Sequence, residues 1–134
     1  MLDNYFLEEI PMTDEERKSV ASTYLHNLDS GKDFFNLFSE DAEVYFPNWG
    51  LAKGSEQYGK LFSDLGALVE GFKHHHDTIN WIIQGDFVVA EGSSQGKLKS
   101  GETWTDSKWC DVFEIRDGKI ERLYIYLDPE YSRY

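Results

Sequence analysis

The spacing of apolar residues changes once along this chain, near His74, and that change constrains the fold more than any other feature. Before His74, apolar residues recur every three or four positions, which is typical of helices with one buried face. After His74, apolar and polar residues alternate, which is typical of strands in a half-buried sheet. Helices followed by an antiparallel meander predict an α+β domain.

Local signals set the limits of these elements. Thr13 and Glu16 form a capping-box pair, and the run Asp29-Ser30-Gly31 is typical of a helix end. Two short polar runs containing glycine predict hairpin turns, at residues 84–86 and 117–118. The predicted helices cover residues 13–28, 34–38 and 55–69. The predicted strands cover residues 43–46, 75–84, 87–97, 103–115 and 119–127.

Length and composition narrow the class of protein. The 134 residues match one domain, 1–134, in which residues 1–12 form a lead segment. A formal net charge of −12 repels phosphates, so we expect binding neither to nucleic acid nor to a membrane surface. The single cysteine, Cys110, excludes an internal disulfide and favours a reducing compartment. With no signal peptide and no membrane span evident, we expect a cytoplasmic protein.

Three segments carry a resemblance to a known superfamily through their order and spacing. They are residues 24–31 (YLHNLDSG), 38–44 (FSEDAEV) and 111–120 (DVFEIRDGKI). Over residues 13–128 the chain resembles the nuclear transport factor 2-like superfamily, in its SnoaL-like and ketosteroid isomerase-like branch. The resemblance implies a cone-shaped fold. In it, three N-terminal helices pack on a curved, mostly antiparallel sheet and enclose an open-ended pocket.

The same resemblance implies what the protein binds. The expected ligand is a small hydrophobic organic molecule. A homodimer is also expected, formed through the outer faces of the sheets, where Tyr124 and Tyr126 would supply aromatic contacts. One fold hosts many chemistries, so the resemblance does not select a reaction.

Asp111 is the leading candidate for a catalytic residue. It shares the apolar face of its strand with Trp109 and Phe113, where burial would raise its pKa and keep the carboxyl neutral. A neutral buried carboxyl stabilises a developing oxyanion by donating a hydrogen bond. The resemblance places Asp111 and Tyr24 at the positions of the isomerase family's oxyanion-hole aspartate and tyrosine. The alternatives are a structural aspartate and a core tyrosine.

The general base of the isomerases has no counterpart in this sequence. The resemblance places that carboxylate after the first short strand, where this chain has Phe46. His76 is the candidate replacement, because a neutral imidazole accepts protons near physiological pH. It also resembles a pocket histidine of the scytalone dehydratase-like branch. Alternation places His74 and His76 on one face of their strand, and the pattern leaves open which face points inward.

The same two histidines raise the question of a metal ion. They are two residues apart on one predicted strand, so both could face one ion. No spacing motif supplies a third ligand, so we expect no metal site and no cofactor. Asp128 resembles an aspartate on the last strand of SnoaL-like cyclases. Alternation places it on the outward face with Tyr124 and Tyr126, so it is not a candidate.

Three functions fit these residues. The first is a cofactor-free isomerase, cyclase or dehydratase for a small hydrophobic ketone or phenol. It would act through an enolate-like intermediate, with Asp111 and Tyr24 as oxyanion donors and His76 as general base. The second is a non-catalytic binding protein for an apolar ligand, and the third is a dimerisation module of the same fold. In each case four aromatic residues are expected to line the pocket or join the core: Phe46, Trp49, Phe62 and Trp109.

Overall fold

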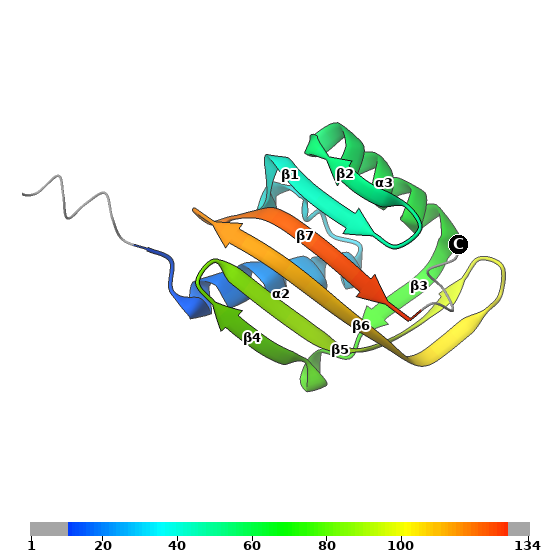
Figure 1. The fold of residues 1–134 in the computed structure, drawn as a ribbon. Coiled ribbons are helices and arrows are strands. Elements are labelled where there is room, and N and C mark those ends of the chain that lie inside the picture. Colours follow the sequence, from blue (N-terminus) through cyan, green and yellow to red (C-terminus); the bar gives the residue numbers. More distant parts are fainter. Residues whose placement is uncertain (1–10, 129–134) are drawn as a thin grey trace, which may run out of the picture.

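The computed structural model describes residues 11–128, in which two α-helices pack on one side of a curved seven-stranded sheet (Figure 1). The predicted lead segment, residues 1–12, lies outside this range except for its last two residues. Within the described range, neither helix is long and apolar enough to cross a membrane. The helices are α2 (Asp14–Ser30) and α3 (Gly54–Leu68). The strands are β1 (Phe38–Phe46), β2 (Gly50–Lys53), β3 (Val69–His74), β4 (Asn80–Gln84), β5 (Phe87–Leu98), β6 (Thr103–Arg116) and β7 (Lys119–Leu127).

The long strand β5 shapes the sheet. The strand order is β2–β1–β7–β6–β5–β3, and β4 also pairs with β5. Residues 87–91 of β5 pair with β4, whereas residues 94–98 pair with β3. The register between β5 and β6 shifts between Ser94 and Gly96, and such irregularities bend a strand. All described pairs are antiparallel except β1 with β7, so the sheet is mixed.

Helix α2 begins and ends where the local signals predict. The Glu16 N–H donates to the Thr13 hydroxyl at 3.1 Å, and the Glu16 carboxylate accepts from the Thr13 N–H at 2.8 Å. Gly31 ends the helix with a φ of 70°, in the left-handed region that glycine adopts without a Cβ penalty. The buried Arg17 fastens the helix to the sheet by donating to the Ile115 carbonyl at 3.0 Å. The first turn of the helix is therefore anchored to the sheet.

Two predicted elements are wrong. Residues 34–38 do not form a third α-helix, because Phe38 already belongs to the extended strand β1 and only a 3-10 turn, Phe35–Leu37, precedes it. Residues 75–84 do not form one strand, because a 3-10 turn at His76–Thr78 separates β3 from β4. Polar residues in a turn can continue the alternation of a strand, so the sequence pattern does not reveal where the strand is interrupted. The strands predicted over 87–97, 103–115 and 119–127 match β5, β6 and β7 to within one residue.

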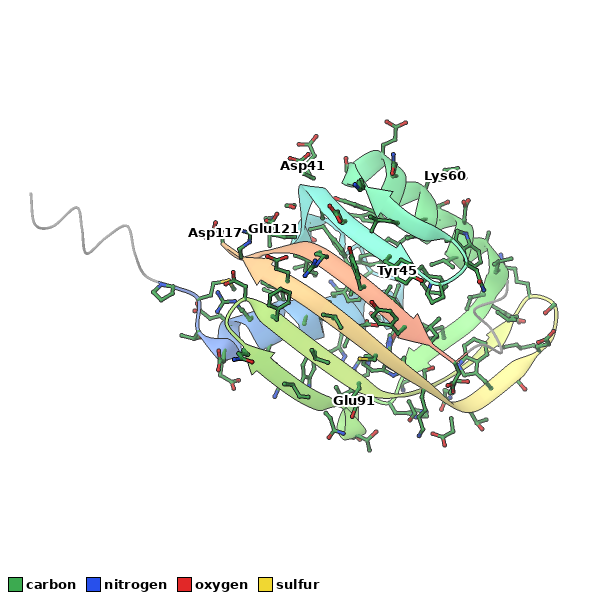
Figure 2. The ribbon with its side chains drawn as sticks, in the orientation of Figure 1. Asp41, Tyr45, Lys60, Glu91, Asp117 and Glu121 are labelled. Atoms are coloured by element: carbon green, nitrogen blue, oxygen red, sulfur yellow. The ribbon has the colours of Figure 1, made fainter. Side chains whose placement is uncertain are left out.

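The outer face of the sheet carries tyrosines. Tyr45, labelled on β1 in Figure 2, has its ring centroid 5.7 Å from that of Tyr124 and 5.8 Å from that of Tyr126. Tyr126 is an exposed large side chain. The sequence analysis assigns a dimer contact to Tyr124 and Tyr126, and that dimer stays a prediction.

The bend near Gly96 generates the first testable prediction. A Cβ added at Gly96 would lie 2.4 Å from the Trp104 ring and 2.6 Å from the Gly71 carbonyl oxygen. Backbone cannot yield to such a contact, so we expect Gly96→Ala to lower the free energy of unfolding by about 1–3 kcal/mol. Urea denaturation followed by circular dichroism measures the change.

Gly59→Ala is the matched control. Gly59 lies inside α3, and an added Cβ there meets nothing within 4 Å. Alanine at this helix position should raise the free energy of unfolding by about 0.5–1 kcal/mol. Equal effects of the two substitutions would contradict the packing of Trp104 against Gly96.

Candidate functional site

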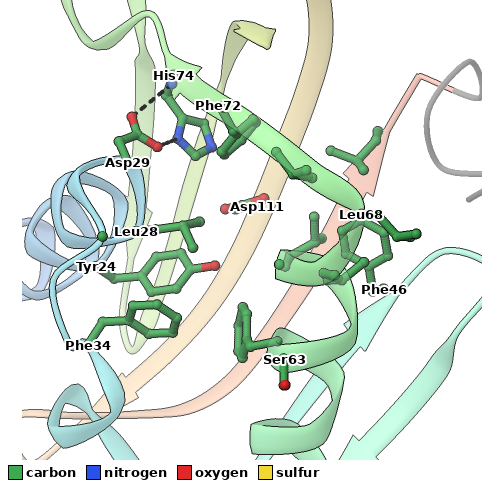
Figure 3. Close-up of a pocket in the computed structure, with 18 of the residues that line it drawn as sticks. Tyr24, Leu28, Asp29, Phe34, Phe46, Ser63, Leu68, Phe72, His74 and Asp111 are labelled. Carbon is green, nitrogen blue, oxygen red and sulfur yellow. Dashed lines mark hydrogen bonds and ion pairs between the residues drawn. The ribbon is translucent and has the colours of Figure 1, made fainter. Parts of the chain in front are cut away.

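A pocket of about 850 Å³ lies between the two helices and the concave face of the sheet (Figure 3). This volume is within the range of sites for small organic ligands. Most of its lining is apolar. Four polar side chains of the lining form the candidate site: Tyr24, Asp29, His74 and Asp111. Tyr24 and Asp29 come from α2, His74 from the end of β3, and Asp111 from the middle of β6.

Five of the seven site residues named from the sequence line this pocket: Tyr24, Phe46, Trp49, Phe62 and Asp111. His76 and Trp109 are not among its lining residues. Trp109 is buried behind the lining, where its indole N–H donates to the Ser93 carbonyl at 2.9 Å. Its ring packs edge-on against His74, with centroids 4.5 Å apart. Trp109 therefore supports a pocket residue from behind.

Asp111 is a carboxyl in an apolar setting. It pairs across the sheet with Ala90 on β5 and Ile125 on β7, and only 3% of its surface is exposed. Burial raises the pKa of Asp111 well above its usual range, because the ionised form loses its hydration. The raised pKa favours the protonated carboxyl, which can donate a hydrogen bond.

Tyr24 has a buried hydroxyl with no hydrogen-bond partner in the part of the chain that the structure describes. Its ring is enclosed by aromatic rings at centroid distances of 5.3–6.3 Å, from Phe34, Phe38, Phe62 and Phe113. Burial raises its pKa well above the ordinary value, and the carboxylates of Asp111 and Asp29, both ionised at the high pH where a tyrosine titrates, raise it further. The hydroxyl therefore stays protonated, and Figure 3 shows it directed toward Asp111.

Asp29 holds two histidines in place. Its Oδ1 accepts from the His74 ring Nδ1 at 2.8 Å, and its Oδ2 accepts from the His76 ring Nε2 at 2.7 Å. The same Oδ2 accepts from the His74 backbone N–H at 2.8 Å. Burial raises the pKa of Asp29, but the hydrogen bonds and charge of His74, with the bond from His76, outweigh it and leave the pKa below its usual range. Asp29 is therefore an ionised carboxylate that only accepts, so both ring nitrogens donate to it.

This arrangement places His74, and not His76, on the pocket. Figure 3 shows the His74 ring between Asp29 and Phe72, so its second nitrogen, Nε2, lies on the side away from Asp29. His76 is not among the lining residues, and its ring stacks on His26 with centroids 3.8 Å apart. The sequence analysis treated Asp29 only as part of a helix end and left the inward face of this segment open. Only the contact between Asp29 and His74, 45 residues apart, identifies the pair.

An α+β fold with a largely apolar pocket on the concave face of its sheet defines the structural class, and comparisons with known proteins agree with this fold. The profile of the SnoaL-like domain matches residues 24–123. The chain therefore belongs to the SnoaL-like domain family. No curated protein matches the sequence.

Three solved structures show the likeness of fold. A candidate polyketide cyclase from Xanthomonas campestris pv. campestris has a TM-score of 0.77 and 16% identity, covering 86% of this chain and 92% of its own. A nuclear transport factor 2-like protein from Burkholderia xenovorans LB400 has a TM-score of 0.72 and 21% identity, covering 87% and 92%. TerC, co-crystallised with polyporic acid, has a TM-score of 0.71 and 17% identity, covering 84% and 92%. At identities this low, the structural likeness establishes the shared fold alone.

The buried carboxyl of Asp111 generates a prediction about stability. Because its pKa is raised in the folded state, the unfolded chain loses this proton first as the pH rises above about 4. The folded state then holds more protons, so its stability falls with rising pH, by at most about 1.4 kcal/mol per pH unit for one proton. Asp111→Asn removes this effect. We expect the variant to match the wild type near pH 4 and to become progressively more stable than it toward pH 8.

Denaturant titrations at unit steps of pH measure this difference. Asp106→Asn, which removes an exposed carboxylate from the same strand, controls for the loss of one charge. A difference between Asp111→Asn and the wild type that stays constant from pH 4 to pH 8 would contradict a raised pKa.

Proposed function

We propose that this chain is an enzyme for a small hydrophobic ketone or phenol, acting through an enolate-like intermediate. The observation that carries the proposal is the buried hydroxyl of Tyr24, which has no partner among residues 11–128 and lies beside the buried carboxyl of Asp111 (Figure 3). A buried donor without a partner costs about 1–3 kcal/mol, so a ligand oxygen that accepts from it would recover that cost.

Tyr24 and Asp111 are proposed as the two oxyanion donors. Both have raised pKa values, which favours the protonated forms that can donate to one oxygen. When a ketone is converted to an enolate, charge develops on that oxygen. Donors fixed in a water-poor pocket stabilise such charge more than water does, because they need no reorganisation. The aromatic lining suits a flat, apolar substrate body.

We propose His74 as the general base, in the role that the sequence analysis gave to His76. Asp29 accepts from Nδ1 of His74, which fixes the tautomer that leaves Nε2 able to take a proton. His74 lines the pocket, whereas His76 contacts Asp29 without being part of the lining. His74 Nε2 would remove a proton next to the carbonyl, while Tyr24 and Asp111 receive the charge on oxygen.

Isomerisation, cyclisation and dehydration share this enolate-like step, so the proposal covers a reaction class. The likeness to a candidate polyketide cyclase and to TerC with bound polyporic acid supports the same class of ligand. The alternative is a binding protein without chemistry. The observation that favours it is the buried Phe46, which lines the pocket at the position where the isomerases carry their base.

Ligand binding tests the oxyanion donors. We expect substituted phenols to bind the pocket, and Tyr24→Phe to weaken binding about 5- to 100-fold, as for the loss of one strong hydrogen bond. The same substitution should leave the free energy of unfolding equal or higher, because it removes an unpartnered hydroxyl. Tryptophan fluorescence titration measures affinity, and denaturation measures stability. A variant that loses stability but binds phenols normally would show that Tyr24 is a core residue.

Proton exchange tests the base and separates enzyme from binding protein. We expect the protein to catalyse exchange of the α-protons of a flat aryl ketone in D₂O, followed by NMR. His74→Gln should lower the rate by about 100-fold or more, as for loss of a general base, with phenol binding retained. His75→Gln, which changes the adjacent histidine outside the pocket lining, is the matched control. Phenol binding without exchange would identify a binding protein, and an equal loss in His76→Gln would return the base to His76.

A further inference from the structure

Asp29, His74 and His76 bring three metal-ligating side chains together at the edge of the pocket. One ligand atom from each lies within 4.8 Å of the others, and the three side chains are 5–19% exposed. We propose that this cluster is a binding site for a Zn²⁺ ion. The proposal does not depend on the proposed enzymatic function.

The donor set suits zinc. Two imidazole nitrogens and one carboxylate oxygen are typical ligands of zinc sites that keep a further position open. Asp29 and His74 also line the pocket, so an open position would lie near its edge. The ionised carboxylate of Asp29 supplies a negative charge for the cation.

The spacing of the ligand atoms is close to what the ion needs. Asp29 Oδ1 lies 2.8 Å from His74 Nδ1, and Asp29 Oδ2 lies 2.7 Å from His76 Nε2. On a tetrahedral zinc ion with bonds of about 2.0–2.1 Å, neighbouring ligand atoms are roughly 3.3 Å apart. The two hydrogen-bonded pairs would therefore have to move apart, any pair near the 4.8 Å limit of the cluster would have to close, and the protons that now point at Asp29 would be lost.

The side chains around the cluster hold its ligands in orientation, as in established metal sites. The His74 backbone N–H fixes Asp29 through a 2.8 Å hydrogen bond to Oδ2. Trp109 packs edge-on against the His74 ring, and His26 stacks on the His76 ring. Each ligand thus has a contact that would persist after the ion bound.

This inference revises the expectation of no metal site. The sequence analysis paired His74 with His76 but found no third ligand. The structure supplies Asp29, at the end of α2, as that third side chain. A net charge of −12 further favours attraction of a divalent cation.

Zinc binding would also change what His74 offers to the pocket. Coordination through Nδ1 places the ring proton on Nε2, so the pocket nitrogen becomes a donor. His74 therefore cannot bind zinc and act as the proposed general base at the same time.

The test is isothermal titration of the chelator-treated, tag-free protein with Zn²⁺, and with Co²⁺ followed by its visible absorption. We expect one ion per chain with a Kd in the micromolar range or tighter, and the absorption bands of low-coordinate Co²⁺. His76→Ala should weaken binding about 10- to 100-fold or more, and Asp29→Asn should do the same. Circular dichroism confirms that each variant is folded.

His75→Ala is the matched control, because the ring nitrogens of His75 contact Ser93 and Gln95 and not the cluster. It should bind zinc as the wild type does. Wild-type affinity no tighter than that of His76→Ala, or an equal loss in His75→Ala, would overturn the site and leave Asp29 as a purely hydrogen-bonded anchor. Because the readout is ion binding, it succeeds or fails separately from α-proton exchange.

Discussion

The pocket depends on the hydrogen bonds that the Asp29 carboxylate accepts. It accepts hydrogen bonds from the His74 backbone, the His74 ring and the His76 ring, and so ties the end of α2 to β3 and to the turn that follows it. A charge buried without partners would be costly, and these three bonds compensate for that loss of hydration. The same bonds set the tautomer of His74. Both the shape of this end of the pocket and its proposed chemistry therefore follow from one side chain.

Tyr24 and Asp111 show the opposite balance. Tyr24 has a buried hydroxyl with no partner among residues 11–128, and Asp111 is a carboxyl whose pKa is raised by its apolar setting. Each lowers the stability of the folded chain when the pocket holds no ligand, whereas a phenylalanine or a leucine would not. A buried polar atom without a hydrogen-bond partner, such as the Tyr24 hydroxyl, is rare in folded proteins, and an accepting oxygen on a bound ligand would supply the missing partner. The contrast with the satisfied Asp29 thus separates the groups that hold the pocket together from the groups that would hold a ligand.

The sequence predicts the residues whose role follows from a local pattern. Alternation along β6 placed Asp111 on the buried face, and the burial of Trp109, Phe113 and Ile115 confirms that face. Asp29 escaped prediction because its local role, near a helix end, gives no sign of a contact 45 residues away. Alternation also could not separate His74 from His76, because the turn that begins at His76 ends the strand between them. A pattern with a fixed period ends at a turn, so it does not predict a contact between residues on the two sides of that turn.

The position of the proposed base relative to the oxyanion donor is where this chain departs from the isomerases it resembles. Asp111 lies on β6, in the middle of the order β1–β7–β6–β5–β3. The isomerase base position, occupied here by Phe46, is on β1, two strands to one side, whereas His74 is on β3, two strands to the other. Figure 3 shows the two residues on different sides of Asp111. If Tyr24 and Asp111 hold the substrate oxygen, a base at His74 would approach the substrate from the side opposite to the isomerase base. The same way of holding the oxygen would then allow a proton to be removed from a different carbon.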